Sequence, residues 1–192
     1  MPRRLCYNQN MPYYLLTAAG PDKAGIVAAA AEILYELGCN LEDSAMTRLR
    51  GEFAILLIFT APAKTSLTEL RRRLQRLEKS HGLTVQLKPM KPRETLEPPR
   101  PQRLCLVTVY GADKPGIVYR VTRLLSKNGV NITDVTTHRT AAGTAKGAAG
   151  YILYLEGELA GADTDRLQGL LQDLGRELGV TVALKPVDAE PL

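Results

Sequence analysis

The chain has 192 residues, of which 45% are hydrophobic, and its formal net charge is +5 at pH 7. This length is compatible with one large domain or two small ones, and so small a positive charge is far from that of a dedicated nucleic-acid-binding protein. The three cysteines, Cys6, Cys39 and Cys105, form no C-x-x-C pair, and neither histidine stands at metal-ligand spacing from them. We therefore expect no disulfide framework, no metal site and no bound cofactor.

Apolar runs in this chain are too short for a membrane span, because a spanning helix needs roughly 18 consecutive residues. The N-terminal stretch MPRRLCYNQNMPYY has two arginines but no apolar segment after them, unlike a secretory signal. These features predict a soluble cytoplasmic protein in which residues 1–11 form a loose tail.

The first strong signal in chain order is the stretch GPDKAGIV at 20–27, which returns as GADKPGIV at 111–118. We call each copy the turn motif. Each copy follows a short β-prone stretch that ends at a glycine, YYLLTAAG or LCLVTVYG, so it marks a strand that runs into a tight turn. A helical pattern with one apolar stripe comes next and ends at a glycine, in GCNLED at 38–43 and in GVNITD at 129–134. A repeat of this kind indicates two domains of the same design.

The remaining elements also occur twice. Apolar strands are expected at FAILLIF (53–59) and YILYLEG (151–157), and an insertion before the second one, AAGTAKGAAG (141–150), predicts a flexible hairpin tip. The next helix of the first half opens with Ser66 and Glu69 at capping-box spacing, and both halves close with a strand, LTVQLKP or VTVALKP. Each half therefore predicts a ferredoxin-like βαββαβ domain of the α+β class, with a four-stranded antiparallel sheet and two helices on one face.

Domain boundaries are predicted from composition. The segment KPMKPRETLEPPRPQR at 88–103 has five prolines and almost no apolar residues, which is typical of an extended linker. We therefore expect a first domain over residues 12–90, a proline-rich linker over 91–103 and a second domain over 104–187.

The turn motif itself permits two interpretations. Asp22 and Asp113 stand where a helix N-cap belongs, Pro115 falls in the first helical turn, and Gly25 and Gly116 come about one turn into the helix. Glycine inside a helix costs roughly 1 kcal/mol relative to alanine, so something must require the absent side chain. Either the helix packs closely on the sheet at this point, or a small carboxylate ligand approaches the helix N-terminus. The sequence leaves both interpretations open.

The turn motif, the trailing G-x-N-x-x-D and the element order resemble the ACT domain, a small regulatory module that binds amino acids. The stretch GCNLEDSAMTRLRGEFAILL at 38–57, the tandem arrangement, the linker and the longer second hairpin are similar to the glycine-cleavage-system transcriptional repressor family. This resemblance implies a small, glycine-like amino acid at an interface between two domains, held by the strand-to-helix turn and by the asparagine after the first helix. The implied ligand-binding residues are Asp22, Lys23, Gly25, Ile26 and Asn40 in the first half and Asp113, Lys114, Gly116, Ile117 and Asn131 in the second.

The two implied sites are not equivalent. Pro115 lacks the backbone N–H that Ala24 keeps, so the first turn has more donors for a ligand. Asn40 and Asn131 also permit a simpler interpretation, as turn residues that follow a helix-ending glycine. Elsewhere, the basic run at 71–73 is expected on the solvated face of its helix, opposite the leucine stripe, and Cys39 is expected to pack in the core.

Two other classes of function have weaker support. Catalysis is not expected, because no Ser-His-Asp or Cys-His spacing and no glycine-rich phosphate loop appears. The alternative is RNA or other nucleic-acid binding, since RNA-recognition modules share the βαββαβ order and RGEFAILLIF at 50–59 echoes their aromatic strand. However, Phe53 and Phe59 do not have the spacing of two stacking rings, and the matching strand of the second half has no ring pair.

The residues and the resemblance together predict a non-catalytic regulatory protein. The expected mechanism is a population shift, in which a small amino acid alters contacts with a protein partner such as a transcription factor. Direct contact with nucleic acid or with a membrane is not expected. A homodimer through sheet edges is expected.

Overall fold

The computed structural model of this protein describes residues 11–91, 103–140, 150–159 and 161–188. The chain divides into two compact units, residues 1–98 and 99–192, which we call domain 1 and domain 2. The expected N-terminal tail, most of the linker and the hairpin tip lie outside the described residues, and the boundaries expected within the linker stay predictions. No described helix is long and apolar enough to cross a membrane.

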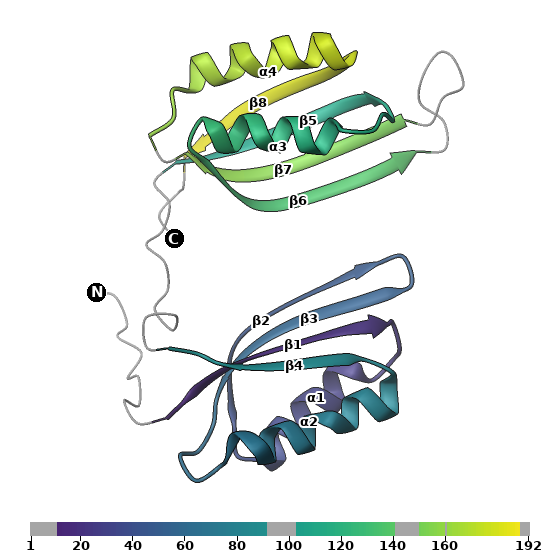
Figure 1. Cartoon of the computed structure of the whole chain (residues 1–192), viewed down its shortest axis with the longest axis vertical. Coiled ribbons are helices and arrows are strands. Elements are labelled where there is room, and N and C mark those ends of the chain that lie inside the picture. Colours follow the sequence, from purple (N-terminus) through teal and green to yellow (C-terminus); the bar gives the residue numbers. More distant parts are fainter. Residues whose placement is uncertain (1–10, 92–102, 141–149, 160, 189–192) are drawn as a thin grey trace. The chain divides into compact units, whose positions relative to one another are not determined.

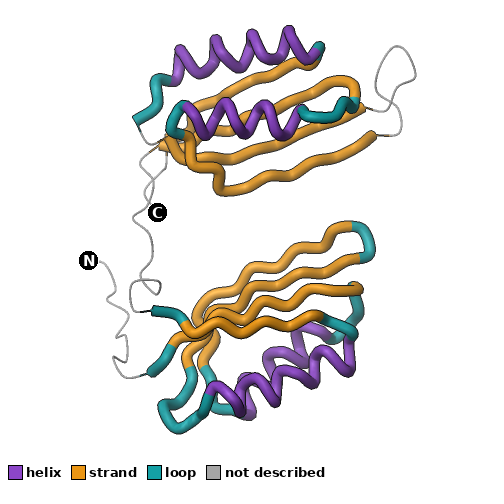
Figure 2. Tube along the Cα trace, in the orientation of Figure 1, coloured by secondary structure: helices purple, strands orange, loops and turns teal. Residues whose placement is uncertain are grey.

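Domain 1 contains six elements in the order strand, helix, strand, strand, helix, strand (Figure 1). The strands form one antiparallel sheet in the order β2-β3-β1-β4, and both helices cover the same face of it (Figure 2). The ferredoxin-like α+β fold expected for this half is confirmed. The elements are β1 (Tyr13–Pro21), α1 (Ile26–Glu36), β2 (Asn40–Leu49), β3 (Glu52–Thr60), α2 (Leu67–His81) and β4 (Thr84–Pro89).

Domain 2 has the same six elements and the same sheet topology, with the strand order β6-β7-β5-β8. The fold expected for the second half is therefore also confirmed. Its elements are β5 (Arg103–Ala112), α3 (Ile117–Lys127), β6 (Val130–Thr140), β7 (Gly150–Leu159), α4 (Thr164–Leu178) and β8 (Val180–Asp188).

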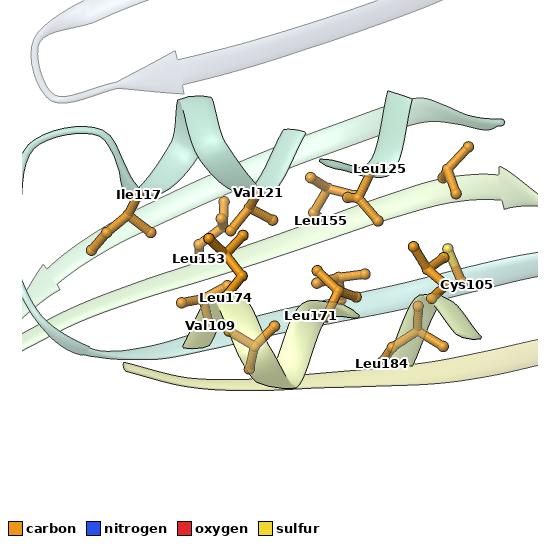
Figure 3. Close-up of a cluster of buried hydrophobic side chains, with 14 of the residues drawn as sticks. Cys105, Val109, Ile117, Val121, Leu125, Leu153, Leu155, Leu171, Leu174 and Leu184 are labelled. Atoms are coloured by element: carbon orange, nitrogen blue, oxygen red, sulfur yellow. The ribbon is translucent and has the colours of Figure 1, made fainter. Parts of the chain in front are cut away.

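Each sheet buries alternate side chains beneath its helices. In β3, Phe53 is 3% exposed and Phe59 is fully buried, whereas Leu56, on the other face, is 47% exposed. This period of two is the pattern of a half-buried strand. Figure 3 shows the core of domain 2, where Val121 and Leu125 of α3 point toward the side chains of the sheet. Each domain thus has a hydrophobic core of its own.

The second helix of each domain has a side-chain cap at its start and a glycine at its end, and the Ser66 cap is the one that the sequence predicts. The Ser66 hydroxyl accepts a hydrogen bond from the backbone N–H of Glu69 at 3.1 Å, and Asp163 caps α4 in the same way. Both helices end at a glycine in the left-handed conformation, Gly82 with a φ of 74° and Gly179 with a φ of 66°. These caps satisfy backbone groups that a helix end leaves without partners.

The basic run on α2 departs in part from the expected solvated face. Arg72 is exposed and pairs with Glu69, and a hydrogen bond from its guanidinium lowers the pKa of that carboxyl. The Arg73 side chain, by contrast, is only 21% exposed and lies 2.8 Å from the Glu36 carboxylate of α1. The expectation is wrong for Arg73, because α1 packs beside α2 and brings a carboxylate to it.

Candidate ligand site at the strand-to-helix turns

The first helix of each domain begins later than the turn motif predicts. The N-caps are Gly25, with a φ of 92°, and Gly116, with a φ of 89°, and neither helix has a side-chain cap. The expectation that Asp22 and Asp113 cap these helices is therefore wrong, and Pro115 precedes its helix instead of lying in its first turn. Because a positive φ costs other residues roughly 1–3 kcal/mol, backbone conformation alone requires a glycine at both caps.

The space beside these two glycines is open. A Cβ atom added to Gly25 or to Gly116 would have no described atom within 4 Å. The close-packing interpretation of the two positions is therefore wrong. Within its own domain, each of these glycines therefore has unoccupied space on its Cβ side.

Close packing occurs at the first glycine of each turn motif instead. A Cβ atom on Gly20 would lie 2.9 Å from the carbonyl oxygen of Gly82, and one on Gly111 would lie 2.7 Å from Cγ1 of Val180. Real Cβ atoms do not approach other atoms so closely. These glycines let the end of the first strand pass against the segment that follows the second helix.

The aspartate of each turn motif pairs with an arginine near the end of the following strand. Asp22 Oδ2 lies 3.2 Å from Arg48 Nη1 in domain 1, and Asp113 Oδ2 lies 2.5 Å from Arg139 Nη2 in domain 2. Sequence reasoning missed both arginines. The signal was available, since they repeat at the same spacing as the turn motif.

The lysine of each turn motif points to the end of the second helix. Lys114 Nζ donates a hydrogen bond to the carbonyl oxygen of Leu178 at 2.7 Å, and Lys23 Nζ lies 3.9 Å from the Cβ position of Gly82. A cation suits the C-terminus of a helix, where carbonyl groups and the negative end of the dipole are exposed. These lysines thus have a structural role within their own domains.

The isoleucines of the turn motif belong to the core. Ile26 is 2% exposed and Ile117 is 1% exposed, so only their backbone N–H groups can reach a ligand. With the aspartates paired and the lysines directed toward the end of the second helix, the part of each turn that is suited to an anion is the main chain at the start of the first helix. The first N–H groups of a helix lack intrahelical partners, and the positive dipole end lies there.

The two asparagines lie at the opposite end of the sheet from the turns. Asn40 is opposite Thr60, which pairs with Tyr13 at the start of β1, whereas the turn follows Pro21 at its end. The eight steps from Tyr13 to Pro21 separate the two features by about 26 Å along the strand direction. Asn131 is related to the second turn in the same way. Within one domain, therefore, the implied ligand-binding residues do not form a single site.

Each asparagine amide donates a hydrogen bond to a carboxylate. Asn40 Nδ2 lies 2.9 Å from Glu42, which also accepts from the Thr60 hydroxyl, and Asn131 Nδ2 lies 3.1 Å from Glu158. Glu42 occupies a β-bulge in β2, whereas Glu158 comes from β7, the partner strand of β6. Because the two glutamates stand on different strands, the repeat spacing could not reveal them.

The nucleic-acid alternative loses its main support in the structure. Phe53 and Phe59 are both buried beneath the helices, so neither can stack on a base.

In domain 2, Tyr110 and Tyr154 are 48% and 44% exposed and lie on the open face of neighbouring strands. This pair escaped the sequence analysis because it joins two strands that are distant along the chain.

Cys39 packs partly against the core of domain 1, and burial raises the pKa of its thiol to about 11. The thiol therefore stays protonated and unreactive near neutral pH. Among the described residues, no group of three histidine, cysteine or acidic side chains is placed to hold a metal ion.

Comparison with known proteins gives matches to both halves of the chain. The family model of the ACT domain matches residues 13–88 and 103–141. The glycine cleavage system transcriptional repressor of Escherichia coli (strain K12) is 26% identical over 177 residues, which cover 92% of this chain and 90% of that protein. A UPF0237 protein of Methanopyrus kandleri is 36% identical over 72 residues, or 37% of this chain and 80% of that protein.

Two solved structures match nearly the whole chain. An unknown protein from Galdieria sulphuraria has a TM-score of 0.75 at 24% identity and covers 92% of this chain and 99% of its own. A structure described as a candidate glycine cleavage system transcriptional repressor has a TM-score of 0.69 at 19% identity, with 93% and 99% coverage. At these identities the likeness shows a shared fold.

Proposed function

The chain belongs to the ACT domain family, and from this premise we propose that it is a non-catalytic regulatory protein that binds a small amino acid at its strand-to-helix turns. Binding alters its contacts with a protein partner. The similarity to a protein named as a glycine cleavage system transcriptional repressor supports a transcriptional regulator of that system as the partner and glycine as the first ligand to test.

The observation that carries this proposal is the open N-terminus of the first helix in both domains. A Cβ atom on Gly25 or Gly116 would meet nothing within 4 Å, so the backbone at the start of each helix is open on that side. The carboxylate of an amino acid fits such a position, because several N–H groups and the dipole converge on it. Turns that are duplicated in this form give the chain two candidate carboxylate sites.

The ammonium group of the ligand needs a second feature, which the asparagine end of a sheet supplies. The carbonyl oxygen of Asn40 and the carboxylate of Glu42 are acceptors suited to an ammonium group. Since the turn and the asparagine of one domain lie at opposite ends of its sheet, a complete site requires the turn of one ACT domain and the asparagine of another. An interface site, as the family resemblance implies, stays a prediction.

In this proposal, the size of the ligand is limited by the ACT domain that supplies the asparagine. The Ile26 side chain is buried, so it does not restrict the space at the turn. A facing domain would enclose the ligand side chain, so that small amino acids are preferred. The ligand would then shift the population of domain arrangements, provided that it binds one arrangement better than the other.

Thermal unfolding of the full chain with each common amino acid at millimolar concentration tests this function. A ligand at about 100 times its dissociation constant stabilises the native state by roughly 2.7 kcal/mol, which raises Tm by roughly 5 to 10 °C for a chain of this size. We expect glycine, serine or alanine to give the largest rise. The variants Asn40→Ala and Asn131→Ala should each reduce this rise in Tm. If no amino acid raises Tm, the proposed amino-acid binding is refuted.

A further inference from the structure

Domain 2 has a surface groove between its two helices, which we call the α3–α4 groove. Leucines of both helices form its floor, and its α3 side carries one aromatic and three basic side chains. The residues that line it include Leu124, Leu170, Leu174, Tyr119, Arg120, Arg123 and Lys127.

The charge of the α3 side is uniform. The helix IVYRVTRLLSK has three basic residues and no acidic one. Arg120 is already paired with Glu177 of α4 at 2.5 Å, which leaves Arg123 and Lys127 as the exposed cations of the groove. They stand one helical turn apart on the same face, which places their Cβ atoms about 6 Å from each other.

Arg123 is held in position by its neighbour. Its guanidinium lies 5.6 Å from the ring centre of Tyr119 and donates a hydrogen bond to the hydroxyl of that residue. A stacked guanidinium keeps its charge and its remaining donors while losing mobility. For Lys127, no partner occurs among the residues that the structure describes, so its ammonium group is free to bind a carboxylate.

Domain 1 shows that the fold does not require this groove chemistry. At the repeat spacing, Tyr119 and Arg120 correspond to Ala28 and Ala29, and Arg123 corresponds to Glu32. Lys127 corresponds to Glu36, which is paired with Arg73. The basic and aromatic side chains are therefore specific to domain 2, where they border an apolar floor.

We propose that the α3–α4 groove binds an acidic amphipathic helix of the protein partner. Apolar side chains of that helix pack on Leu124 and Leu170, and two of its carboxylates, one turn apart, pair with Arg123 and Lys127. Helix-in-groove recognition uses this combination of apolar anchors and flanking charges. The proposal rests on the proposed function, because it identifies the surface by which the partner is held.

The same features disfavour a nucleic acid as the occupant. A phosphodiester backbone has no apolar side chains to bury against Leu170 and Leu174, and a row of two free cations is short compared with a typical set of phosphate contacts. A helix with leucines and glutamates satisfies the floor and the cations together.

A peptide titration with the full chain tests this proposal. The probe is a fluorescent synthetic helix that carries leucines at i, i+4 and i+7 and glutamates beside them, and the matched control peptide has lysines in place of the glutamates. By fluorescence anisotropy we expect the acidic peptide to bind at least tenfold more tightly than its control. Equal affinity for the two peptides, or no binding of either, would overturn the proposal.

Variants of the chain locate the binding. Arg123→Glu combined with Lys127→Glu should lower the affinity for the acidic peptide at least tenfold, and Leu170→Ser should lower it severalfold. The control variant Glu32→Lys on domain 1 should leave the affinity within twofold of the wild type. Circular dichroism and thermal unfolding check that each variant is folded. Unchanged affinity in the double variant of a folded chain would overturn the proposed surface.

Two further measurements identify a wrong occupant. If a DNA or RNA oligonucleotide binds as tightly as the acidic peptide and is lost in the double variant, the groove is a nucleic-acid site. If sedimentation shows a dimer that the double variant converts to monomer, the occupant is a second copy of the chain. Peptide binding without any amino-acid effect on Tm would retain this groove and refute only the proposed ligand.

Discussion

The two turn motifs have the same backbone conformation but differ in how many of their polar groups are engaged. In domain 2, Lys114 is hydrogen-bonded to a helix-ending carbonyl, Asp113 pairs with Arg139 at 2.5 Å, and proline replaces one N–H. In domain 1, the ion pair of Asp22 is longer, at 3.2 Å, and Ala24 keeps its N–H. The comparison teaches that the same motif engages more of its polar groups in contacts within its own domain in domain 2 than in domain 1.

The outer helical surfaces differ more than the turns do. On its outer surface, the first helix of domain 1 carries small and acidic side chains, among them Ala28, Ala29 and Glu32. The first helix of domain 2 carries basic side chains and Tyr119 at the corresponding positions. The buried stripes of both helices remain apolar. Core packing thus holds the two copies to one fold, while the side chains on the outer surfaces of their first helices differ.

The largest expected effect tests the shared backbone conformation. Gly25→Val and Gly116→Val each place a β-branched residue at a positive φ, so we expect each to lower the free energy of unfolding by about 2 to 3 kcal/mol. Urea unfolding of the two variants beside the wild type measures this. If either variant loses less than about 0.5 kcal/mol of unfolding free energy, its turn relaxes easily, and the two turns do not constrain the backbone equally.

The next effect separates the two lysines. Lys114→Met removes a charged hydrogen bond at the end of α4, so we expect a loss of about 1 kcal/mol after allowing for solvent exposure. Lys23→Met should lose less than half of that, because Lys23 only approaches the end of α2. Urea unfolding of both variants gives the comparison, and equal losses would contradict the difference between the turns.

A smaller effect tests the missing backbone donor. Pro115→Ala restores an N–H at the second turn, and because proline restricts the unfolded chain, we expect the variant to lose about 0.4 to 1 kcal/mol of stability. Its amino-acid-induced rise in Tm should nevertheless exceed that of the wild type. Ala24→Pro is the matched variant and should lower the rise. If both variants leave the rise unchanged, this N–H does not contact the ligand.

The smallest effect is a pH dependence confined to domain 2. Burial raises the pKa of Tyr151, whose hydroxyl is hydrogen-bonded to Thr137, and Phe53 stands at the matching position of domain 1. In the window between the unfolded pKa, near 10, and the higher folded pKa, the unfolded state binds fewer protons, so stability falls as pH rises.

Unfolding curves from pH 8 to pH 11 measure this loss, which Tyr151→Phe should remove while other alkaline effects remain. An equal loss in the Tyr151→Phe variant would assign the pH dependence to other groups.

The sequence by itself determined the βαββαβ order, the apolar stripes and the ACT resemblance, because these depend on local periodicity and on short motifs. The cap at Ser66 was also predictable, since its partner, Glu69, is three residues away. The family match and the fold confirm these predictions. The ligand-binding roles of the individual residues stay predictions.

Only the tertiary structure decided what the polar residues of the turn motif do. Asp22 was expected to cap a helix, but Arg48, which lies 26 residues away along the chain, provides a partner for its carboxylate. The sheet register places Asn40 far from the turn, although both belong to one implied site. The physical reason is that such pairings depend on which strands lie side by side and in which direction each runs, and neither is encoded in local spacing.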